Sequence, residues 1–380
     1  MPIDSPKPLG TISPAPSRLA AFFRDVYVFD WDKLTFRADL ILVLPVALCL
    51  AIGLAAGHPG AALITAGGAA TIGFGAKQQI GDSRLLPMIL ASLGIAFSTF
   101  LGMIAGHTNA VLVPLAGLWG FGYGVLTKRE AGYGWVGQQC VVTLLVGSAF
   151  PFSAKAASVR ALLLLAGGAV QVVSTSVALR LWTQLRTDLA QLGSHVRAEQ
   201  DALRLAMLEI ASDVKQFQFS DSVVPYAIRL MITLAVSTEI YRQLHFSSGY
   251  WIPMTALLVL KPGIADTASR AIARTLGTIA GAWVLTVLVA HFTPSTVGLA
   301  IFALIFAWLS YATVNVNYAL FAVCITGYIV FLLSLAQIPE GEIAGRRALC
   351  TAIGGALALT VRLLVIHYRR RPRSSEAVGS

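Results

Sequence analysis

The stretch GYWIPMTALLVLKPGIADTASRAIARTLGTIAG, residues 249–281, decides how this chain is interpreted. It begins with an apolar segment that Lys261-Pro262-Gly263 ends after about three helical turns. Crossing a bilayer core takes about 20 helical residues, so segment 249–262 would barely span a membrane. A second apolar run follows from Leu276 to Ala290. The stretch therefore predicts a short helix followed by a membrane-spanning one.

Three charged residues lie between the two apolar runs. Asp266, Arg270 and Arg274 are spaced by four, so they share one face of the second helix, near its positive dipole end. Charge at the edge of a membrane must be solvated, paired or used to hold an anion. One interpretation is an anion gate, in which the guanidinium groups bind a carboxylate at the cytoplasmic mouth. The alternative is simple anchoring at the cytoplasmic surface by snorkelling side chains.

The same stretch resembles the signature of a known family. The run Tyr250-Trp251-Ile-Pro-Met-Thr, then Lys261-Pro-Gly, then both arginines followed by Leu276-Gly-Thr, is similar to the fusaric acid resistance family. These bacterial membrane proteins are similar to aromatic acid exporters and, more distantly, to plant aluminium-activated malate transporters. The resemblance implies an inner-membrane exporter of aromatic or other weak organic acids, driven by the proton gradient. An organic anion would be the substrate, and a periplasmic adaptor is an expected partner. Tyr250, Trp251 and Lys261 then join the arginines as candidate substrate-binding residues.

Composition supports the membrane class. Of 380 residues, 56% are hydrophobic and 12% charged, and the mean hydropathy is +0.74. Such a chain has too little charge for an ordinary soluble domain, which predicts an all-α polytopic membrane protein. The glycine-rich runs 117–124 and 132–137 lack the ending of a phosphate-binding loop, so neither an enzyme nor a cofactor is expected. The net charge of +10 is assigned to cytoplasmic loops, with no nucleic acid as partner.

Apolar runs predict about twelve membrane spans. They lie near residues 39–57, 60–76, 86–106, 109–126, 133–150, 160–182, 224–243, 249–262, 274–291, 294–312, 317–337 and 346–367. The predicted organisation is a tail with an interfacial helix (1–38), a membrane half (39–182), a linker helix (183–222), a second half (223–367) and a basic tail (368–380). Basic loops place both termini in the cytoplasm, although Arg160, Arg346 and Arg347 depart from this pattern.

The two halves look like copies of each other. The run Arg160-Ala-Leu-Leu-Leu-Leu-Ala-Gly-Gly-Ala matches Arg347-Ala-Leu-Cys-Thr-Ala-Ile-Gly-Gly-Ala, and Leu93-Gly94 matches Leu276-Gly277. Six spans in each half would make the repeats parallel, with an axis along the membrane normal. If segments 60–76 and 249–262 only dip into the bilayer, the repeats are inverted instead. The charge pattern favours the parallel arrangement.

The repeat places a second set of candidates in the first half. Lys77, Asp82 and Arg84 correspond to the charged residues of the 249–281 stretch and follow a glycine-rich short segment. Short, interrupted segments at equivalent places indicate a transporter's binding site, although small residues also serve close helix packing. Asp82 and Asp266 either hold the arginines and carry a coupling proton, or cap the helices that follow them.

Two further charges lie within the seventh span, and a long linker separates the halves. Arg229 and Glu239 are candidates for pairing or proton coupling, because an isolated charge is costly in a membrane. Residues 183–222 repeat apolar positions every seven, which predicts an amphipathic helix that packs on the protein itself or forms a homodimer. A passive anion channel and a non-transporting scaffold remain alternatives to the exporter.

Overall fold

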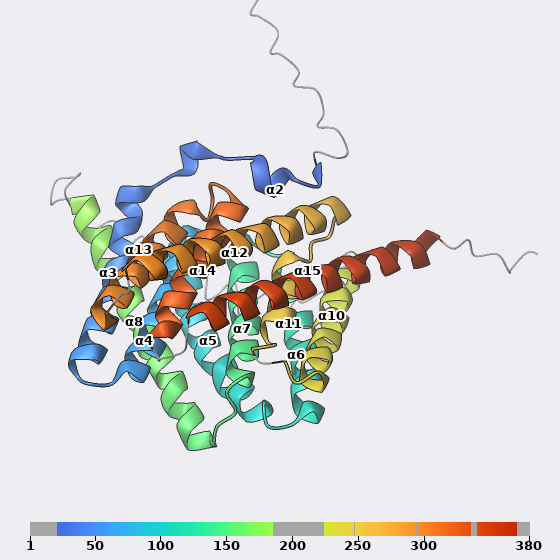
Figure 1. Cartoon of the computed structure of the whole chain (residues 1–380), viewed down its shortest axis with the longest axis horizontal. Helices are drawn as coiled ribbons and strands as arrows, with labels where there is room; N and C mark the ends of the chain where they lie inside the picture. Colours follow the sequence, from blue (N-terminus) through green and yellow to red (C-terminus); the bar gives the residue numbers. More distant parts are fainter. Residues whose placement is uncertain (1–20, 185–223, 247, 293–294, 336–339, 371–380) are drawn as a thin grey trace, which may run out of the picture.

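The fold, a computed structural model, is helical throughout the residues that it describes, 21–184, 224–246, 248–292, 295–335 and 340–370 (Figure 1). Each of the twelve predicted apolar segments contains one helix, which confirms the all-α membrane class. These helices are α3 (Phe36–Ala55), α4 (Pro59–Gly73), α5 (Leu85–Ala105), α6 (Asn109–Leu126), α7 (Ala131–Ser148), α8 (Ala154–Gln184), α10 (Val224–Gln243), α11 (Trp251–Val259), α12 (Ile264–Phe292), α13 (Thr296–Thr313), α14 (Tyr318–Ser334) and α15 (Glu340–Arg370).

Six of the described helices are long and apolar enough to cross a membrane. They comprise α5, α6, α13 and parts of three longer helices, 154–178 of α8, 264–288 of α12 and 345–367 of α15. Residues 39–55 of α3 and helix α14 are shorter apolar helices. Helix α11 has nine residues, which rise about 14 Å, or less than half of a bilayer core. On its own, α11 cannot span.

Helix α11 nevertheless returns along α10. The Tyr241 ring near the end of α10 borders Gly249, which precedes α11. At the other end, the Tyr226 hydroxyl near the start of α10 donates a hydrogen bond of 3.0 Å to the carbonyl of Leu260, just after α11. The short helix and its flanking residues therefore cover most of the length of α10. A return of this kind is what the parallel arrangement requires, while the orientation in the membrane stays a prediction.

Helix packing repeats between the halves. Helix α4 packs against α8 as α11 does against α15, and α5 packs against α7 and α8 as α12 does against α14 and α15. A Cβ on Gly167 would overlap the carbonyl oxygen of Thr65, and one on Gly354 would lie 2.5 Å from that of Ile252. The two glycines and the two carbonyls are each 187 positions apart. The predicted internal repeat is thus visible at the level of single contacts.

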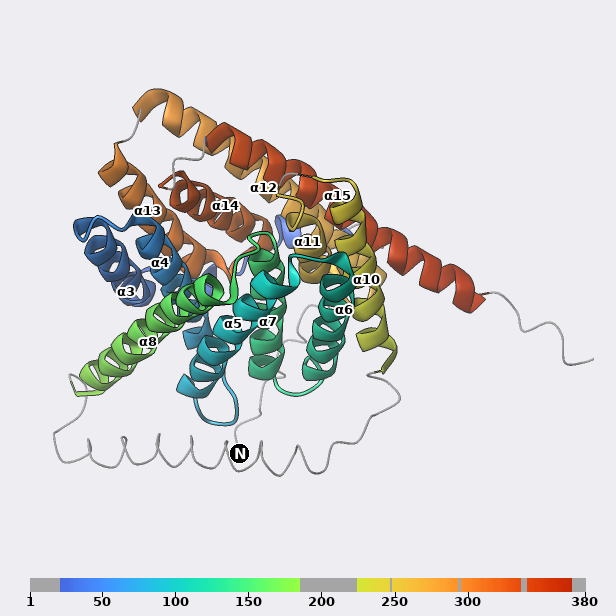
Figure 2. The ribbon, with the colours of Figure 1, turned by 90° about the horizontal axis from the view of Figure 1, so that it is seen from below.

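The first helix of each half also packs against a helix of the other half. Helix α10 of the second half packs against α6, and α3 of the first half packs against α13 (Figure 2). These two contacts are equivalent under the repeat, since α3 corresponds to α10 and α6 to α13. The exchange joins the halves into one bundle.

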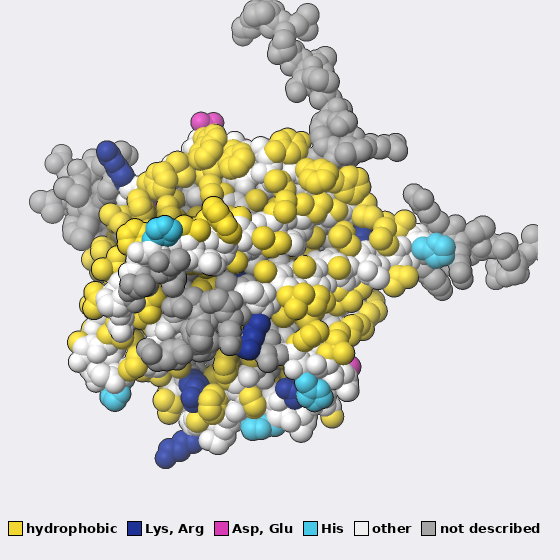
Figure 3. Space-filling view, viewed as in Figure 1, with side chains coloured by type: hydrophobic (Ala, Val, Ile, Leu, Met, Phe, Trp, Pro, Cys, Tyr) yellow, Lys and Arg dark blue, Asp and Glu magenta, His cyan; other side chains and the backbone are white. Residues whose placement is uncertain are grey.

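The outer face of the bundle is apolar. Leu276, Ile279, Trp283 and Val287 of α12 are exposed, with Trp283 at 70%, and they recur at spacings of three and four. Helix α15 likewise exposes Leu349, Leu363 and Leu364. Hydrophobic side chains cover most of the face that these helices present (Figure 3). A large apolar surface suits a lipid environment rather than water.

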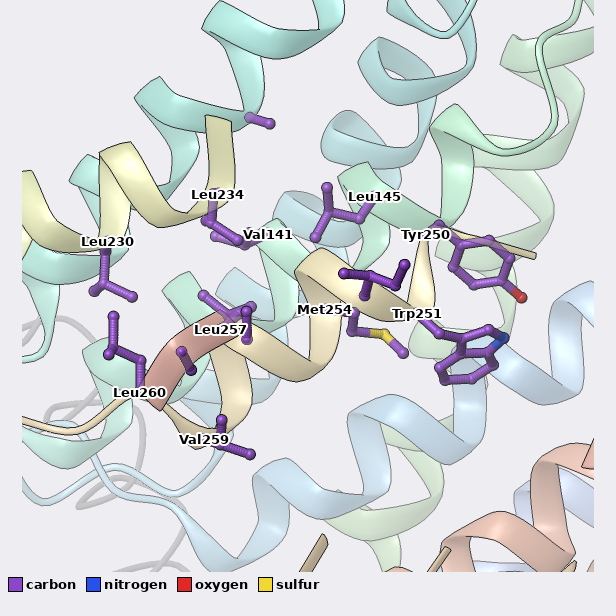
Figure 4. Close-up of a cluster of buried hydrophobic side chains, with 14 of the residues drawn as sticks. Val141, Leu145, Leu230, Leu234, Tyr250, Trp251, Met254, Leu257, Val259 and Leu260 are labelled. Atoms are coloured by element: carbon purple, nitrogen blue, oxygen red, sulfur yellow. The ribbon is translucent and has the colours of Figure 1, made fainter. Parts of the chain in front are cut away.

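Helix α11 packs against α10, α12 and α15 of its own half and against α7 of the first half. Eight of its nine residues are buried, and they pack with Val141 and Leu145 of α7 and Leu230 and Leu234 of α10 (Figure 4). Tyr250 and Trp251 lie together at its amino-terminal end, with ring centroids 5.1 Å apart. The motif that opens the 249–281 stretch is therefore part of the core, where it positions the loop that follows.

The interfacial helix predicted within residues 1–38 falls partly outside the described residues. Between residues 22 and 35, the structure forms the short helix α2 (Arg24–Tyr27) and the 3₁₀ turn η1 (Trp31–Lys33), and residues 28–30 lie outside both elements. The Asn317 side chain donates to the carbonyls of Val26 (3.2 Å) and Val28 (2.8 Å). This segment therefore docks on the protein. Most of the linker 183–222, on which the homodimer prediction rests, and residues 1–20 and 371–380 lie outside the described residues.

Candidate anion-binding site

The join between α11 and α12 is held by its own hydrogen bonds. The chain turns at Lys261-Pro262-Gly263, and α12 begins at Ile264. The Thr267 hydroxyl accepts a bond from the Lys261 amide (3.0 Å) and donates to the carbonyl of Gly263 (2.7 Å). Because these backbone groups are satisfied locally, the loop has one conformation from which α12 can direct its side chains.

Arg270 and Arg274 meet at Tyr318, the first residue of α14. The Arg270 guanidinium carbon lies 3.9 Å from the centroid of the Tyr318 ring, and Arg274 Nη1 lies 3.4 Å from its hydroxyl oxygen. Arg270 is half-buried, whereas Arg274 is only 5% exposed. The prediction that the two arginines share a face is confirmed, and that face points into the bundle.

A third arginine, Arg347 of α15, completes what we call the arginine cluster: Arg270, Arg274 and Arg347. Arg347 is 1% exposed, and its guanidinium carbon lies 4.0 Å from the Trp251 ring centroid. It interacts electrostatically with Arg274 and with Tyr250. From the sequence, Arg347 was a departure from the charge pattern and the first residue of a repeat match, and it was not predicted as a site residue. Its place at the head of a predicted span, in the run matched to Arg160, was the signal that could have identified it.

The arginine cluster has few carboxylates around it. Asp25 of α2 lies 3.8 Å from Arg270 Nη1, and its backbone amide bonds to the Ser269 hydroxyl at 2.7 Å. Within the described parts of the chain, neither Arg274 nor Arg347 forms an ion pair. Nε of all three arginines and Nη1 of Arg347 are buried and lack a hydrogen-bond partner there. Buried, unpaired guanidinium groups are costly unless an anion joins them.

Lys261 adds a fourth cation at the edge of the cluster. Burial, and then the charge of Arg270, lowers the pKa of Lys261 to about 8, while Asp25 and Asp266 oppose the change. Below that pH Lys261 carries its charge and would add to the attraction for an anion. The four cations and Asp25 thus bring together α2, α12, α15 and the α11–α12 loop.

The predicted helix caps are wrong for both aspartates. Asp266 is the third residue of α12, in its first turn. A negative charge there interacts favourably with the helix dipole, but it does not cap the helix. In the first half, α5 begins at Leu85, and the Ser83 hydroxyl accepts from the Leu86 amide at 3.2 Å. Asp82 is exposed in the loop before it. The side chain that accepts a hydrogen bond from the first turn of α5 is therefore Ser83 and not Asp82.

Lys77 and Arg84 line a separate pocket in the first half. This pocket of about 520 Å³ is also bordered by Gln78, Gln79 and Asn315. Lys77 is paired, at 3.0 Å from the Asp39 carboxylate and 2.5 Å from the carbonyl oxygen of Tyr311. Arg84 is exposed. The pair thus occupies the equivalent place without forming a buried cluster.

Arg229 and Glu239 are not brought to the arginine cluster. Arg229 Nε donates to the carbonyl of Pro225 at 3.1 Å, and Glu239 accepts from the Gln243 amide at 2.5 Å. Both bonds span one turn of α10, and the two side chains are half-buried. Their predicted role in pairing or proton coupling stays a prediction.

Comparison with known proteins places the similarity on the half that holds the cluster. Residues 233–361 match the family described as fusaric acid resistance protein-like. The inner membrane protein YccS of Escherichia coli (strain K12) is 33% identical over 134 residues, which are 35% of this chain and 18% of that relative. No solved structure matches the chain.

The matched residues include α11, α12, the α13–α14 turn and most of α15, so they supply Trp251, Arg270, Arg274, Tyr318 and Arg347. The aligned part is less than a fifth of the curated relative's length, and the family match leaves residues 1–232 of this chain outside. Through its second half, the chain is thus related to the fusaric acid resistance family, as the 249–281 stretch predicted.

Proposed function

We propose that this protein exports aromatic or other weak organic acids across the bacterial inner membrane, with its termini in the cytoplasm. The observation that carries the proposal is the meeting of Arg270 and Arg274 at Tyr318, with Asp25 on Arg270 and no carboxylate ion pair on Arg274 among the described residues. A carboxylate is the organic group that guanidinium pairs bind best, because it accepts two parallel hydrogen bonds.

The aromatic rings beside the cluster favour aromatic acids. Tyr318, Trp251 and Tyr250 all lie next to an arginine of the cluster, and their rings present flat apolar surface. Aromatic pairs add a modest stabilisation of about 0.5–1.5 kcal/mol beyond burial. An aliphatic acid would keep the charge contact and lose this part.

The amino-terminal segment supplies the carboxylate that faces the outer arginine. Asp25 forms an ion pair with Arg270, so an incoming carboxylate would replace a carboxylate that is already there. Such an exchange keeps the charge of Arg270 balanced while the substrate enters.

A passive anion channel is the second candidate. Arginines without a carboxylate partner, such as Arg274 and Arg347 among the described residues, would also suit the lining of an anion-conducting pore. The homologous relative is named an inner membrane protein, which supports the proposed location and does not separate the two modes. Partners, including a periplasmic adaptor, stay part of the proposal.

The test is benzoate transport in proteoliposomes, with and without an imposed pH gradient. Arg270→Gln/Arg274→Gln is compared with the wild type at equal protein insertion. An exporter shows gradient-dependent flux that the double variant loses. Flux set by voltage alone would establish a channel, and unchanged flux in the double variant would remove the site from the proposal.

A further inference from the structure

We propose that Arg274 and Arg347 form an inner anion site that binds the carboxylate of an aromatic monocarboxylate. This inference rests on the proposed function and deepens it, because it separates an outer position at Arg270 and Lys261 from a buried one. The two arginines come from α12 and α15, which pack side by side in both ribbon views (Figure 1, Figure 2).

Burial and pairing distinguish the inner position from the outer one. Arg270 has Asp25 beside it, and its side chain is 35% exposed. Arg274 and Arg347 are 5% and 1% exposed, interact with each other and have no ion pair in the described part of the chain. Two like charges held together away from water repel strongly, so this pair is stable only at a considerable cost.

A purely structural role does not explain the arrangement. The repeat provides a comparison in Arg160, whose guanidinium carbon lies 3.6 Å from the Phe152 ring centroid and whose Nη1 donates to the Ala156 carbonyl. Arg160 is half-buried. An arginine stacked on a ring therefore recurs at this position. Complete burial belongs to Arg347 alone of the two.

The donors at the inner site define the ligand's chemistry. Arg347 offers Nε and Nη1 and Arg274 offers Nε, and none of these atoms has an acceptor among the described residues. A guanidinium group only donates, so the missing partner must be an acceptor, and a negative charge would offset the repulsion. The ring of Trp251, 4.0 Å from the Arg347 carbon, favours an acid with an aromatic group.

The experiment is thermal unfolding in detergent at low chloride, with sodium benzoate or sodium chloride added at equal ionic strength. A ligand that binds only the folded protein raises its unfolding temperature. The variants are Arg347→Met, which keeps length without charge, Arg347→Lys, which keeps charge without the planar fork, and the matched control Arg160→Met.

We expect Arg347→Met to unfold about 2 °C or more above the wild type without added anion, because it removes a buried unpaired charge. We also expect it to lose the benzoate-induced shift. Arg347→Lys should need about tenfold more benzoate for the same shift. Arg160→Met should keep the wild-type shift.

Three results would overturn the inner site. A fall in unfolding temperature for Arg347→Met with the benzoate shift intact would make Arg347 structural. An equal shift with chloride would remove the carboxylate assignment, and a wild type without any benzoate shift would remove the site. Failure of the proposed function looks different, because a benzoate shift that depends on Arg347 would then persist without flux in proteoliposomes.

Discussion

The packing of α8 on α4 and that of α15 on α11 are two versions of one arrangement. Gly167 and Gly354 lie against the carbonyls of Thr65 and Ile252, and the glycine after each lies beside a hydroxyl, that of Ser92 or Thr275. Close approach of helix backbones through small residues is a common means of association in membranes. The scaffold is therefore the same in both halves.

The charged residues on this shared scaffold differ between the two halves. In the first half, Lys77 is neutralised by Asp39 at 3.0 Å, whereas in the second, burial and then the charge of Arg270 lower the pKa of Lys261. The offset of 187 residues set by the two glycine contacts puts the buried Pro87 where the second half has Arg274. One copy of the repeat is thus packed and neutral where the other concentrates positive charge.

Substitutions at the glycine contacts that both halves share should have the largest effects on stability, and the effects should be equal in the two halves. Gly167→Val and Gly354→Val each place a branched side chain against a backbone carbonyl, which cannot move aside. Overpacking of this kind costs about 1–3 kcal/mol, so both variants should unfold several degrees below the wild type in detergent. Gly67→Val is the matched control, because nothing lies within 4 Å of a Cβ there. A large loss for one glycine alone would mean that the halves are not equivalent.

The sequence predicted the scaffold better than the site. Among the described residues, hydrophobic runs located the twelve helices α3–α8 and α10–α15, because a membrane helix must be apolar over most of its length. Spacing placed Arg270 and Arg274 on one face, and the paired Gly-Gly runs aligned the halves. These features depend on local periodicity, which a single sequence contains.

The rest depends on contacts between distant segments. Arg347 meets Trp251 and Arg274 only because α15 packs on α11 and α12, and Asp25 reaches Arg270 from 245 positions away in the chain. These contacts arise from tertiary packing, so the spacing of residues along the sequence does not predict them. Lys77 looked like a free cation for the related reason that its partner, Asp39, lies 38 residues earlier.

The contrast in charge predicts unequal effects on transport. Arg274→Gln removes a buried cation at the candidate site, and hydrogen bonds to charged groups contribute about 1.5–3 kcal/mol. Benzoate flux in proteoliposomes should therefore fall about tenfold or more. Arg84→Gln, in the exposed pocket of the first half, should change flux less than about twofold. Similar losses in both variants would show that the first half also binds the anion.

The smallest effect concerns pH and distinguishes the two lysines. Because burial and Arg270 lower the pKa of Lys261 to about 8, this side chain is charged at pH 7 and neutral at pH 9. Benzoate stays ionised above about pH 5, so the titration expected within this window is that of Lys261. The affinity for benzoate should fall about two- to fivefold as the pH rises through 8, which matches the value of a partly exposed charge contact.

Lys261→Met should bind benzoate at the weaker level at every pH. Lys77→Met should keep the wild-type profile, because Asp39 neutralises Lys77 away from the arginine cluster. Equilibrium binding of labelled benzoate between pH 7 and 9 measures this, and an inflection that survives in Lys261→Met would assign the titration to another group.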